Sequence, residues 1–370
     1  MQPRYEVARV LELAGEGIDQ LGLNSWQLRC LWAIKACRTV ALGGHVDGCT
    51  ACGKVSISYN SCRNRHCPKC QGHKREQWIE AREQELLPVP YFHVVFTLPE
   101  ALNGYALYAP KQVYDALFSA AWQTLAAFGI RKGIKPGMIG ILHTWGQTLS
   151  LHPHLHCIVP GGGVQEGVQW RSIRADGKYL FPVKAMSKVF RAKYVALLTE
   201  SIKLEKPLRD KLFEKPWVVY AKRPFGSPQS VVEYLGRYTH KIAISNHRIK
   251  EVSDTRVIFS YKDYKQKGQQ KIMCLNPEEF IRRFAMHILP KGFVKIRHYG
   301  FLSSTWKRQK LQVLQGQLQV KRPEQAKATK HRICPCCGRG QLVTLMTFDK
   351  RGPPESVLLG MGQKSTACKV

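Results

Sequence analysis

Two pairs of cysteines near the N-terminus have the spacing of a metal site. Cys49 and Cys52 form one Cys-x2-Cys turn, and Cys67 and Cys70 form a second one, fourteen residues further along the chain. Each such turn directs two thiolates toward one point, and four thiolates satisfy tetrahedral Zn²⁺. The spacing therefore predicts one structural zinc ion held by these four residues. The alternative is four free thiols that pack as small apolar side chains.

Other residues leave the identity of the four ligands open. Four of them lie close enough in the sequence to replace a ligand or to build a second site: His45, Cys62, His66 and His73. Near the C-terminus, Cys334 and Cys337 form half a zinc site. Three residues are candidates to complete it: Cys336, His331 and Cys368. Residues 45–73 have little apolar periodicity, so we expect this segment to fold around its metal.

Basic side chains surround the N-terminal cysteine turns. They are Arg63, Arg65, Lys69, Lys74 and Arg75. Basic residues on a metal-stabilised module are typical of a surface that contacts the phosphates of DNA, and a solvated basic face is the alternative. We predict that these five residues bind DNA.

A second kind of metal site is expected at two alternating histidines. His154 and His156 precede a strand-like run, so their side chains share one face of the strand. Pairing with a strand over residues 137–147, through a connection at 148–153, places Gln147 opposite His154 as a third ligand. His143 shares that face but lies about 13 Å along the strand, which makes it the weaker candidate. Two packed histidines without a metal are the alternative.

The predicted ligand set suggests a chemistry. His154, His156 and Gln147 are neutral ligands that leave coordination positions for water and a phosphate oxygen. That arrangement suits Mg²⁺ or Mn²⁺ acting as a Lewis acid on a phosphodiester.

A pair of tyrosines supplies candidate nucleophiles. Tyr234 and Tyr238 are four residues apart on an expected helix, so they lie on one face, about 6 Å apart along its axis. Lys241 follows at the spacing where an ammonium can stabilise a phenolate or the developing phosphorane charge. This spacing favours Tyr238 as the more active residue in nicking. Packing of both rings in a core is the alternative.

Composition narrows the class of partner. Among 370 residues, 57 are Lys or Arg and 26 are Asp or Glu, which gives a net charge of +31. Such a field favours nucleic acid over an acidic protein or an anionic lipid surface. No apolar run is long enough to cross a bilayer, and the N-terminus does not resemble a signal peptide. We therefore expect a cytoplasmic protein that is associated with the nucleoid when it is bound to DNA.

The elements that position these residues indicate an α+β fold. Expected helices span residues 111–128, 187–203 and 227–240, and expected strands span 91–99, 137–147, 153–160 and 217–222. Asn276, Pro277 and Glu279 predict the start of a further helix by the capping rules. The expected domains are a helical and zinc-binding DNA-recognition domain at 1–85, a catalytic domain at 86–250, its C-terminal continuation at 251–320, and a basic tail with a partial zinc knuckle at 321–370.

At these residues the sequence resembles the IS91-family transposases, two-tyrosine members of the HUH single-strand endonucleases. The resemblance covers roughly residues 25 to 305 and is carried by NSCRNRHCPKCQ, PVPYFHVVFTLP, LHTWG, HPHLHCIVPGGG, YLGRYTHKIAI and KGFVKIRHYGFLSS. It implies an HUH core with a central antiparallel sheet. It also implies that His154 and His156 hold the catalytic metal, and that Tyr234 and Tyr238 attack DNA to leave a 5′-phosphotyrosine and a free 3′-hydroxyl.

The resemblance further implies rolling-circle transposition on single-stranded DNA from the element's ends and on target DNA. Transesterification conserves the phosphodiester bond energy, and the chain has no GxxxxGK[ST] phosphate loop, so a helicase is expected from the host replication machinery. Two alternatives stay open at this point. One is a replication initiator or relaxase of a plasmid or phage with the same chemistry, and the other is a non-catalytic zinc-ribbon protein that binds nucleic acid.

Overall fold

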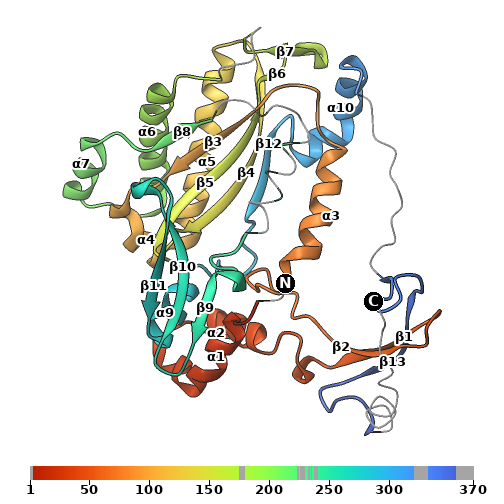
Figure 1. Ribbon diagram of the computed structural model, residues 1–370. Helices are drawn as coiled ribbons and strands as arrows, with labels where there is room; N and C mark the ends of the chain where they lie inside the picture. The colour runs from red at the N-terminus through yellow and green to blue at the C-terminus, as the bar shows by residue number, and fades with distance from the viewer. Residues whose placement is uncertain are drawn as a thin grey trace.

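The fold is organised around a seven-stranded antiparallel sheet (Figure 1). The structure is a computed structural model that describes residues 3–174, 180–222, 225, 230–231, 234, 236, 241–320 and 332–355. Six strands follow the order β7-β6-β4-β5-β3-β8, and β12 also pairs with β4. Their bounds are β3 Tyr91–Thr97, β4 Lys135–Trp145, β5 Leu151–Pro160, β6 Gly162–Val164, β7 Trp170–Ser172, β8 Val219–Ala221 and β12 Ile296–Gly300.

One face of this sheet is covered by helices, as the apolar pattern of residues 111–128 predicts. The helices are α4 Asn103–Tyr108, α5 Pro110–Ile130, α6 Val183–Ser201 and α7 Lys206–Glu214. Phe118 of α5 and Phe190 of α6 are fully buried in the cluster that includes Phe96 of β3. Gly140 of β4 allows the Phe118 ring to pack directly on the strand. This large core makes the sheet a rigid support for the site on its other face.

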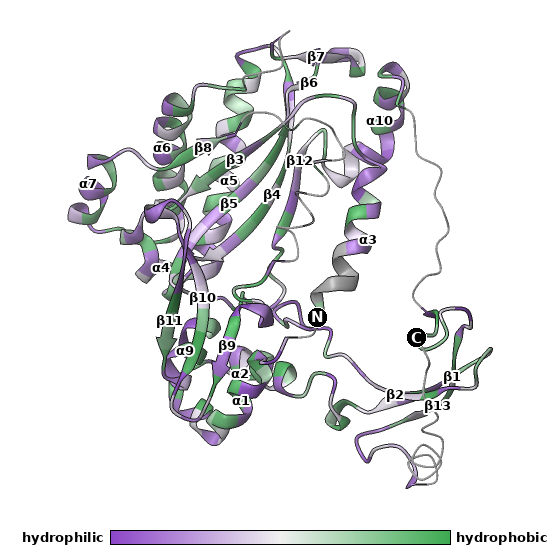
Figure 2. Ribbon diagram, viewed as in Figure 1, coloured by the Kyte–Doolittle hydropathy of each residue, from purple (hydrophilic) through white to green (hydrophobic). Residues whose placement is uncertain are grey.

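The opposite face is only partly covered by apolar side chains. Ile139, Ile141 and Ile158 pack there against residues of α10 Ser304–Gln317, while Trp78 of α3 Gln71–Glu83 lies at the edge of the same cluster. In Figure 2 the second half of β5 has the hydrophobic colour, whereas its first half is hydrophilic. The polar side chains of β5 are thus concentrated at one end of an otherwise apolar sheet.

A second core joins the N-terminal helices to a C-terminal unit. Helices α1 Val7–Ala14 and α2 Ser25–Lys35 pack with α9 Pro277–Ala285 and with the sheet of β9, β10 and β11. The strands span Ile249–Val252, Val257–Asp263 and Gln269–Leu275. The predicted cap of α9 is confirmed, because the Asn276 side chain accepts a hydrogen bond of 2.7 Å from the Glu279 backbone. The Glu279 carboxylate pairs with Arg282 and Arg283 on the same helix.

A third, smaller sheet combines a segment from the N-terminal part of the chain with a strand from its C-terminal part. Strands β1 Gly44–Cys49 and β2 Val55–Tyr59 form a hairpin, and β13 Leu342–Phe348 pairs with the other edge of β1. Figure 1 shows this small sheet set apart from the large one. The expected basic tail therefore contains a strand that completes the N-terminal hairpin.

The predicted fold class is confirmed, since the protein is α+β and has an antiparallel sheet flanked by helices. Among the described residues, no helix combines the length and the apolar character that spanning a bilayer requires.

Candidate metal and nucleophile site

Three histidines from two neighbouring strands gather on the less covered face of the large sheet. His154 and His156 lie on β5, and His143 of β4 lies directly opposite His154. Each offers a ring nitrogen, and these nitrogens lie within 4.8 Å of one another. The ring of His143 lies 5.5 Å from that of His154 and 4.5 Å from that of His156, measured between centroids. The predicted histidine pair therefore belongs to a group of three, which we call the histidine cluster.

The expected position of Gln147 is wrong, because the strand register differs from the predicted one. Strand β4 ends at Trp145, and the connection to β5 occupies residues 146–150. The pairing carries a bulge between His143 and Trp145, so His143 takes the place across from His154. Gln147 lies in the turn, where its backbone oxygen accepts a hydrogen bond from Arg248. The third ring nitrogen near the pair thus comes from His143, the candidate that sequence spacing had disfavoured.

Hydrogen bonds orient two rings of the histidine cluster. Nδ1 of His154 lies 2.6 Å from the backbone oxygen of His152, so it donates its proton there. Nδ1 of His156 lies 2.8 Å from Nε2 of His93 on β3. In both rings Nε2 is then the nitrogen that can bind a cation.

Burial keeps these rings in the form that a metal needs. It lowers the pKa of His154 to about 4, and it lowers the pKa of His156 well below its usual value. The charge of Lys241 contributes further to both shifts. Both imidazoles are consequently neutral near pH 7, with a lone pair available. A set of three imidazole ligands suits a divalent transition metal better than Mg²⁺, whose preferred ligands are oxygens.

His93 connects the histidine cluster to a tyrosine. Its Nδ1 lies 3.0 Å from the hydroxyl of Tyr234, which occupies a helical position, while its Nε2 faces His156. Burial, with a contribution from the charge of Lys222, lowers the pKa of His93 to about 4. Sequence analysis missed His93 because it lies in a run of buried strand residues. The register of β3 against β5, which brings Val95 opposite His156, is what reveals it.

The other predicted nucleophile, Tyr238, lies outside the described residues. Among the described residues, Tyr234 is connected to the histidine cluster through His93.

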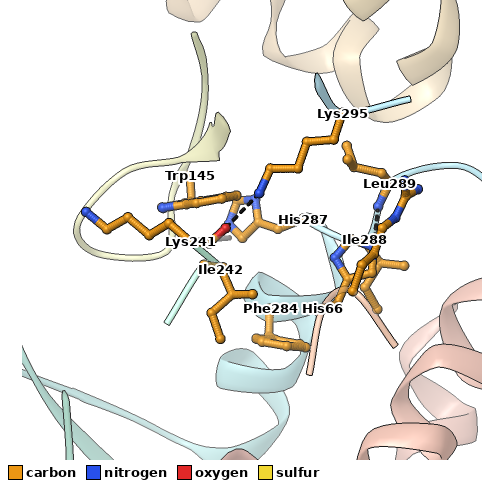
Figure 3. Close-up of a pocket in the computed structure, with 11 residues that line it drawn as sticks. His66, Trp145, Lys241, Ile242, Phe284, His287, Ile288, Leu289 and Lys295 are labelled. Carbon is orange, nitrogen blue, oxygen red and sulfur yellow. Dashed lines mark hydrogen bonds between the residues drawn. The ribbon is translucent and has the colours of Figure 1, made fainter. Parts of the chain in front are cut away.

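Two lysines contribute positive charge beside the histidine cluster. Figure 3 shows Lys295 directed toward the backbone oxygen of Lys241, at 2.7 Å, while the Lys241 side chain extends in a different direction. The Lys295 ammonium also lies 5.1 Å from the centre of the Trp145 ring. Burial, together with the nearby charge of Arg65, lowers the pKa of Lys295 to about 7. The pocket drawn in Figure 3 is lined by three basic side chains, Arg65, Lys241 and Lys295, and by no acidic one. The pocket therefore attracts anions.

The four cysteines predicted to share one zinc ion do not meet. Cys67 and Cys70 instead lie with Cys37 and Cys62, and the four sulfur atoms are within 4.8 Å of one another. Sγ of Cys70 is 3.5 Å from that of Cys37 and 3.7 Å from that of Cys62. The prediction failed because a Cys-x2-Cys turn fixes local geometry only, whereas tertiary contacts decide which pairs come together. Cys62 was among the candidate replacements, whereas Cys37 was not.

The other predicted pair lies in a second group of cysteines. Cys49 and Cys52 are gathered with Cys334 and Cys337, again with all sulfurs within 4.8 Å. The half site near the C-terminus thus lies with the N-terminal turn and not with Cys336. The other two candidates, His331 and Cys368, lie outside the described residues.

The predicted DNA-binding residues divide into different environments. Arg65 donates to the backbone oxygens of Phe293 and Pro290, so the structure uses its guanidinium to join two segments of the protein. Lys69 pairs with Glu6 at 2.6 Å and is mostly buried. Two of the five side chains that were expected to bind DNA thus make internal contacts. Lys74 and Arg75 lie on α3, and their side chains are outside the part of the chain that the structure describes.

Arg63 keeps the position expected of a DNA contact. It is exposed and lines a groove with Arg38, Tyr59 and four polar neighbours, His45, Ser58, Asn60 and Ser61. Both arginines have a positive φ, 52° for Arg63 and 59° for Arg38, which is uncommon outside glycine. Two exposed cations and an aromatic ring form a surface suited to a phosphate backbone and a base.

Comparisons with known proteins match two parts of the chain to family models. A family model described as a transposase zinc-binding domain matches residues 12–98, and one described as "Putative transposase" matches residues 137–310. A relative from Sinorhizobium fredii (strain NBRC 101917 / NGR234), named "Putative transposase y4qJ", is 42% identical over 388 residues, covering 94% of this chain and 97% of the relative. The transposase for insertion sequence element IS801 of Pseudomonas savastanoi pv. phaseolicola is 28% identical over 302 residues, covering 78% of this chain and 73% of that protein. No solved structure matches the chain.

Proposed function

Since the chain belongs to the IS91 family of transposases, we propose that it nicks and joins single-stranded DNA through 5′-phosphotyrosine intermediates during rolling-circle transposition. The observation that carries this proposal is the path from the Tyr234 hydroxyl through His93 to His156. It places a candidate nucleophile one residue away from a group of three imidazoles. A zinc-binding protein without catalytic activity has no use for that arrangement.

The histidine cluster is the proposed site of the catalytic metal. His143, His154 and His156 would hold it, and Mn²⁺ fits their nitrogens better than Mg²⁺ does. When bound, the metal supplies Lewis-acid polarisation of the scissile phosphate. The charge of Lys295 and Lys241 beside the histidine cluster adds electrostatic stabilisation for that phosphate.

The hydrogen bonds around His93 prepare Tyr234 for attack. If Nε2 of His156 binds a cation, its Nδ1 carries the ring proton and donates it to Nε2 of His93. His93 then holds its own proton on Nδ1 and donates it to the Tyr234 oxygen. A donor at this position stabilises the phenolate, which a tyrosine of ordinary pKa near 10 needs in order to act as a nucleophile at neutral pH.

Attack by Tyr234 exchanges one phosphoester bond for another. The bond between its oxygen and phosphorus forms, the bond between phosphorus and the 3′ oxygen breaks, and water receives the phenol proton and protonates the 3′ oxygen. The number of phosphoester bonds is unchanged, so the step needs no nucleotide cofactor. The free 3′-hydroxyl can prime synthesis by the host replication machinery, and Tyr238 is the proposed second nucleophile for strand transfer.

The proposal is tested with labelled single-stranded DNA from the ends of the element, incubated with and without Mn²⁺. We expect a DNA–protein adduct on denaturing gels that requires the metal and that the Tyr234→Phe, Tyr238→Phe double variant lacks. Tyr264→Phe is the matched control, because that ring is 72% exposed and is neither of the two proposed nucleophiles. Cleavage with no adduct would point to hydrolysis by water and would overturn the tyrosine mechanism, and binding without cleavage would indicate a non-catalytic protein.

A further inference from the structure

The second group of cysteines has the dimensions of a tetrahedral metal centre. The sulfurs of Cys49 and Cys337 are 3.7 Å apart, and those of Cys52 and Cys334 are 3.8 Å apart. A tetrahedron with zinc–sulfur bonds of about 2.3 Å has sulfur–sulfur edges of about 3.8 Å. Disulfide bonds are much shorter, at about 2.05 Å. The distances therefore match four thiolates around one ion.

The two halves of this group have the same local structure. Each is a Cys-x2-Cys-Gly turn, and the glycines, Gly53 and Gly338, have φ values of +66° and +65°. In each turn the backbone oxygen of the first cysteine accepts a hydrogen bond from the glycine, at 3.1 Å from Gly53 and 2.9 Å from Gly338. A positive φ lets the chain reverse so that both sulfurs face one side.

Backbone amides also point toward these sulfurs. Ala51 and Cys52 donate to Sγ of Cys49, and Gly340 donates to Sγ of Cys337. Hydrogen bonds to sulfur stabilise the thiolate form, which is the form that binds a metal. Gly340 also has to be glycine, because a Cβ there would lie 2.4 Å from Sγ of Cys49. The backbone around the four sulfurs is thus arranged for metal ligands.

The small sheet beside these turns has little else to hold it together. Its strands, β1, β2 and β13, contribute no residue to any of the three apolar cores found in the described part of the chain. Apolar side chains of β13 face solvent, with Val343 46% and Leu345 62% exposed. A unit with so small a buried area usually needs a metal or a disulfide to be stable.

We propose that Cys49, Cys52, Cys334 and Cys337 bind a structural zinc ion of their own, separate from the group of Cys37, Cys62, Cys67 and Cys70, and that this ion joins the N-terminal hairpin to the C-terminal strand β13. All four positions are filled by thiolates, so the centre is closed and has no place for water or substrate. Cys334 and Cys337 lie outside the segment matched by the zinc-binding family model. The centre connects residues more than 280 positions apart, since Cys52 and Cys334 are separated by 282. The inference does not depend on the tyrosine chemistry.

Zinc content of paired variants tests this proposal. Two double variants are compared with the unaltered protein by elemental analysis. One carries Cys49→Ser and Cys52→Ser, and the other carries Cys334→Ser and Cys337→Ser. Each double variant should contain one zinc per chain fewer than the unaltered protein. The variant with all four changes should lose that same single zinc and no more. Cys274→Ser is the control, because that thiol is exposed and belongs to neither cysteine group. Unchanged zinc in the Cys334, Cys337 variant, or a loss of two in the fourfold variant, would overturn the shared centre.

A second measurement uses the unaltered protein, so its result does not depend on whether the cysteine variants fold. Cys52 is exposed and Cys337 is half-buried, so free thiols at these positions would be accessible to N-ethylmaleimide, as Cys274 is. We expect both to be protected until a chelator is added, and then to become labelled together with Cys49 and Cys334. Labelling of Cys52 and Cys337 at the rate of Cys274 before chelation would contradict the proposal.

Discussion

His93 is proposed to form hydrogen bonds with both His156 and Tyr234, and two different substitutions can test each contact separately. It is 4% exposed, and it contacts His156 through Nε2 and Tyr234 through Nδ1. Glutamine can place its amide oxygen roughly where Nε2 lies in histidine and accept there from Nδ1 of His156, whereas asparagine can place its amide nitrogen roughly where Nδ1 lies and donate there to Tyr234. His93→Gln should therefore keep the contact to His156 and lose the contact to Tyr234, and His93→Asn should do the reverse.

The expected size of each effect follows from these contacts. Loss of a group that orients a metal-bound histidine weakens metal affinity by about 10- to 100-fold, or about 1.4–2.7 kcal/mol. We therefore expect His93→Asn and His93→Ala to bind Mn²⁺ more weakly by that factor, while His93→Gln stays within about threefold of the unaltered protein. At saturating Mn²⁺, adduct formation in His93→Gln should be slower by about 100-fold, since the hydrogen bond from Nδ1 of residue 93 to the Tyr234 oxygen is lost.

The assay combines direct metal binding with single-turnover chemistry. Free Mn²⁺ is measured by electron paramagnetic resonance, which needs no DNA, and the adduct is followed on gels. His247→Ala, which changes an exposed histidine, controls for the loss of an imidazole, and Tyr234→Phe should leave Mn²⁺ binding unchanged. Unaltered Mn²⁺ affinity in both His93→Ala and His93→Asn would refute the proposed support of His156.

Other predictions address the ligands, the DNA surface and stability. His143→Ala should weaken Mn²⁺ binding by at least tenfold in direct titrations, whereas Gln147→Ala should leave it unchanged; the opposite result would restore the register expected from sequence. Arg38→Ala and Arg63→Ala should each weaken DNA binding in filter-binding assays. Each should also reduce the slope of the logarithm of the binding constant against the logarithm of the salt concentration by about one, and unchanged slopes would show that the groove does not contact DNA. Arg282 and Arg283, on the same helix, lower the pKa of Glu279 to about 2 from an ordinary 4.5. The contribution of Glu279 to the free energy of unfolding is therefore complete above about pH 4.5 and is lost as the pH falls toward 2. Glu279→Gln should therefore lower the free energy of unfolding by about 0.5–1 kcal/mol at pH 7 and by less at pH 3, and equal losses at both pH values in thermal melts would count against this pairing.

Much of the fold was predictable because its signals are local. The buried strand at β3 and the cap of α9 depend on residues within one segment, and the structure confirms both. The position of His143 was not predictable, because it depends on where the connection between β4 and β5 begins. A bulge and a shorter connection changed the residue that faces His154.

The partners of the cysteines were even less accessible to sequence analysis. Spacing identified each Cys-x2-Cys turn correctly as a unit. The meeting of Cys52 with Cys334 depends on the pairing of β1 with β13, which lie at opposite ends of the chain. No local pattern encodes such a contact. His93 was missed for a similar reason, since its role depends on the alignment of β3 with β5 and on the position of Tyr234.

The central claim is that tyrosine forms the covalent link to DNA, and mapping that link tests it most directly. The unaltered protein is incubated with Mn²⁺ and single-stranded DNA from the element's ends, the adduct is digested with protease and nuclease, and the modified peptide is sequenced by mass spectrometry. We expect a nucleotide on Tyr234 or Tyr238, with Tyr234 modified in the Tyr238→Phe variant. A nucleotide on any other residue, or an adduct that persists when both tyrosines are phenylalanine, would contradict it.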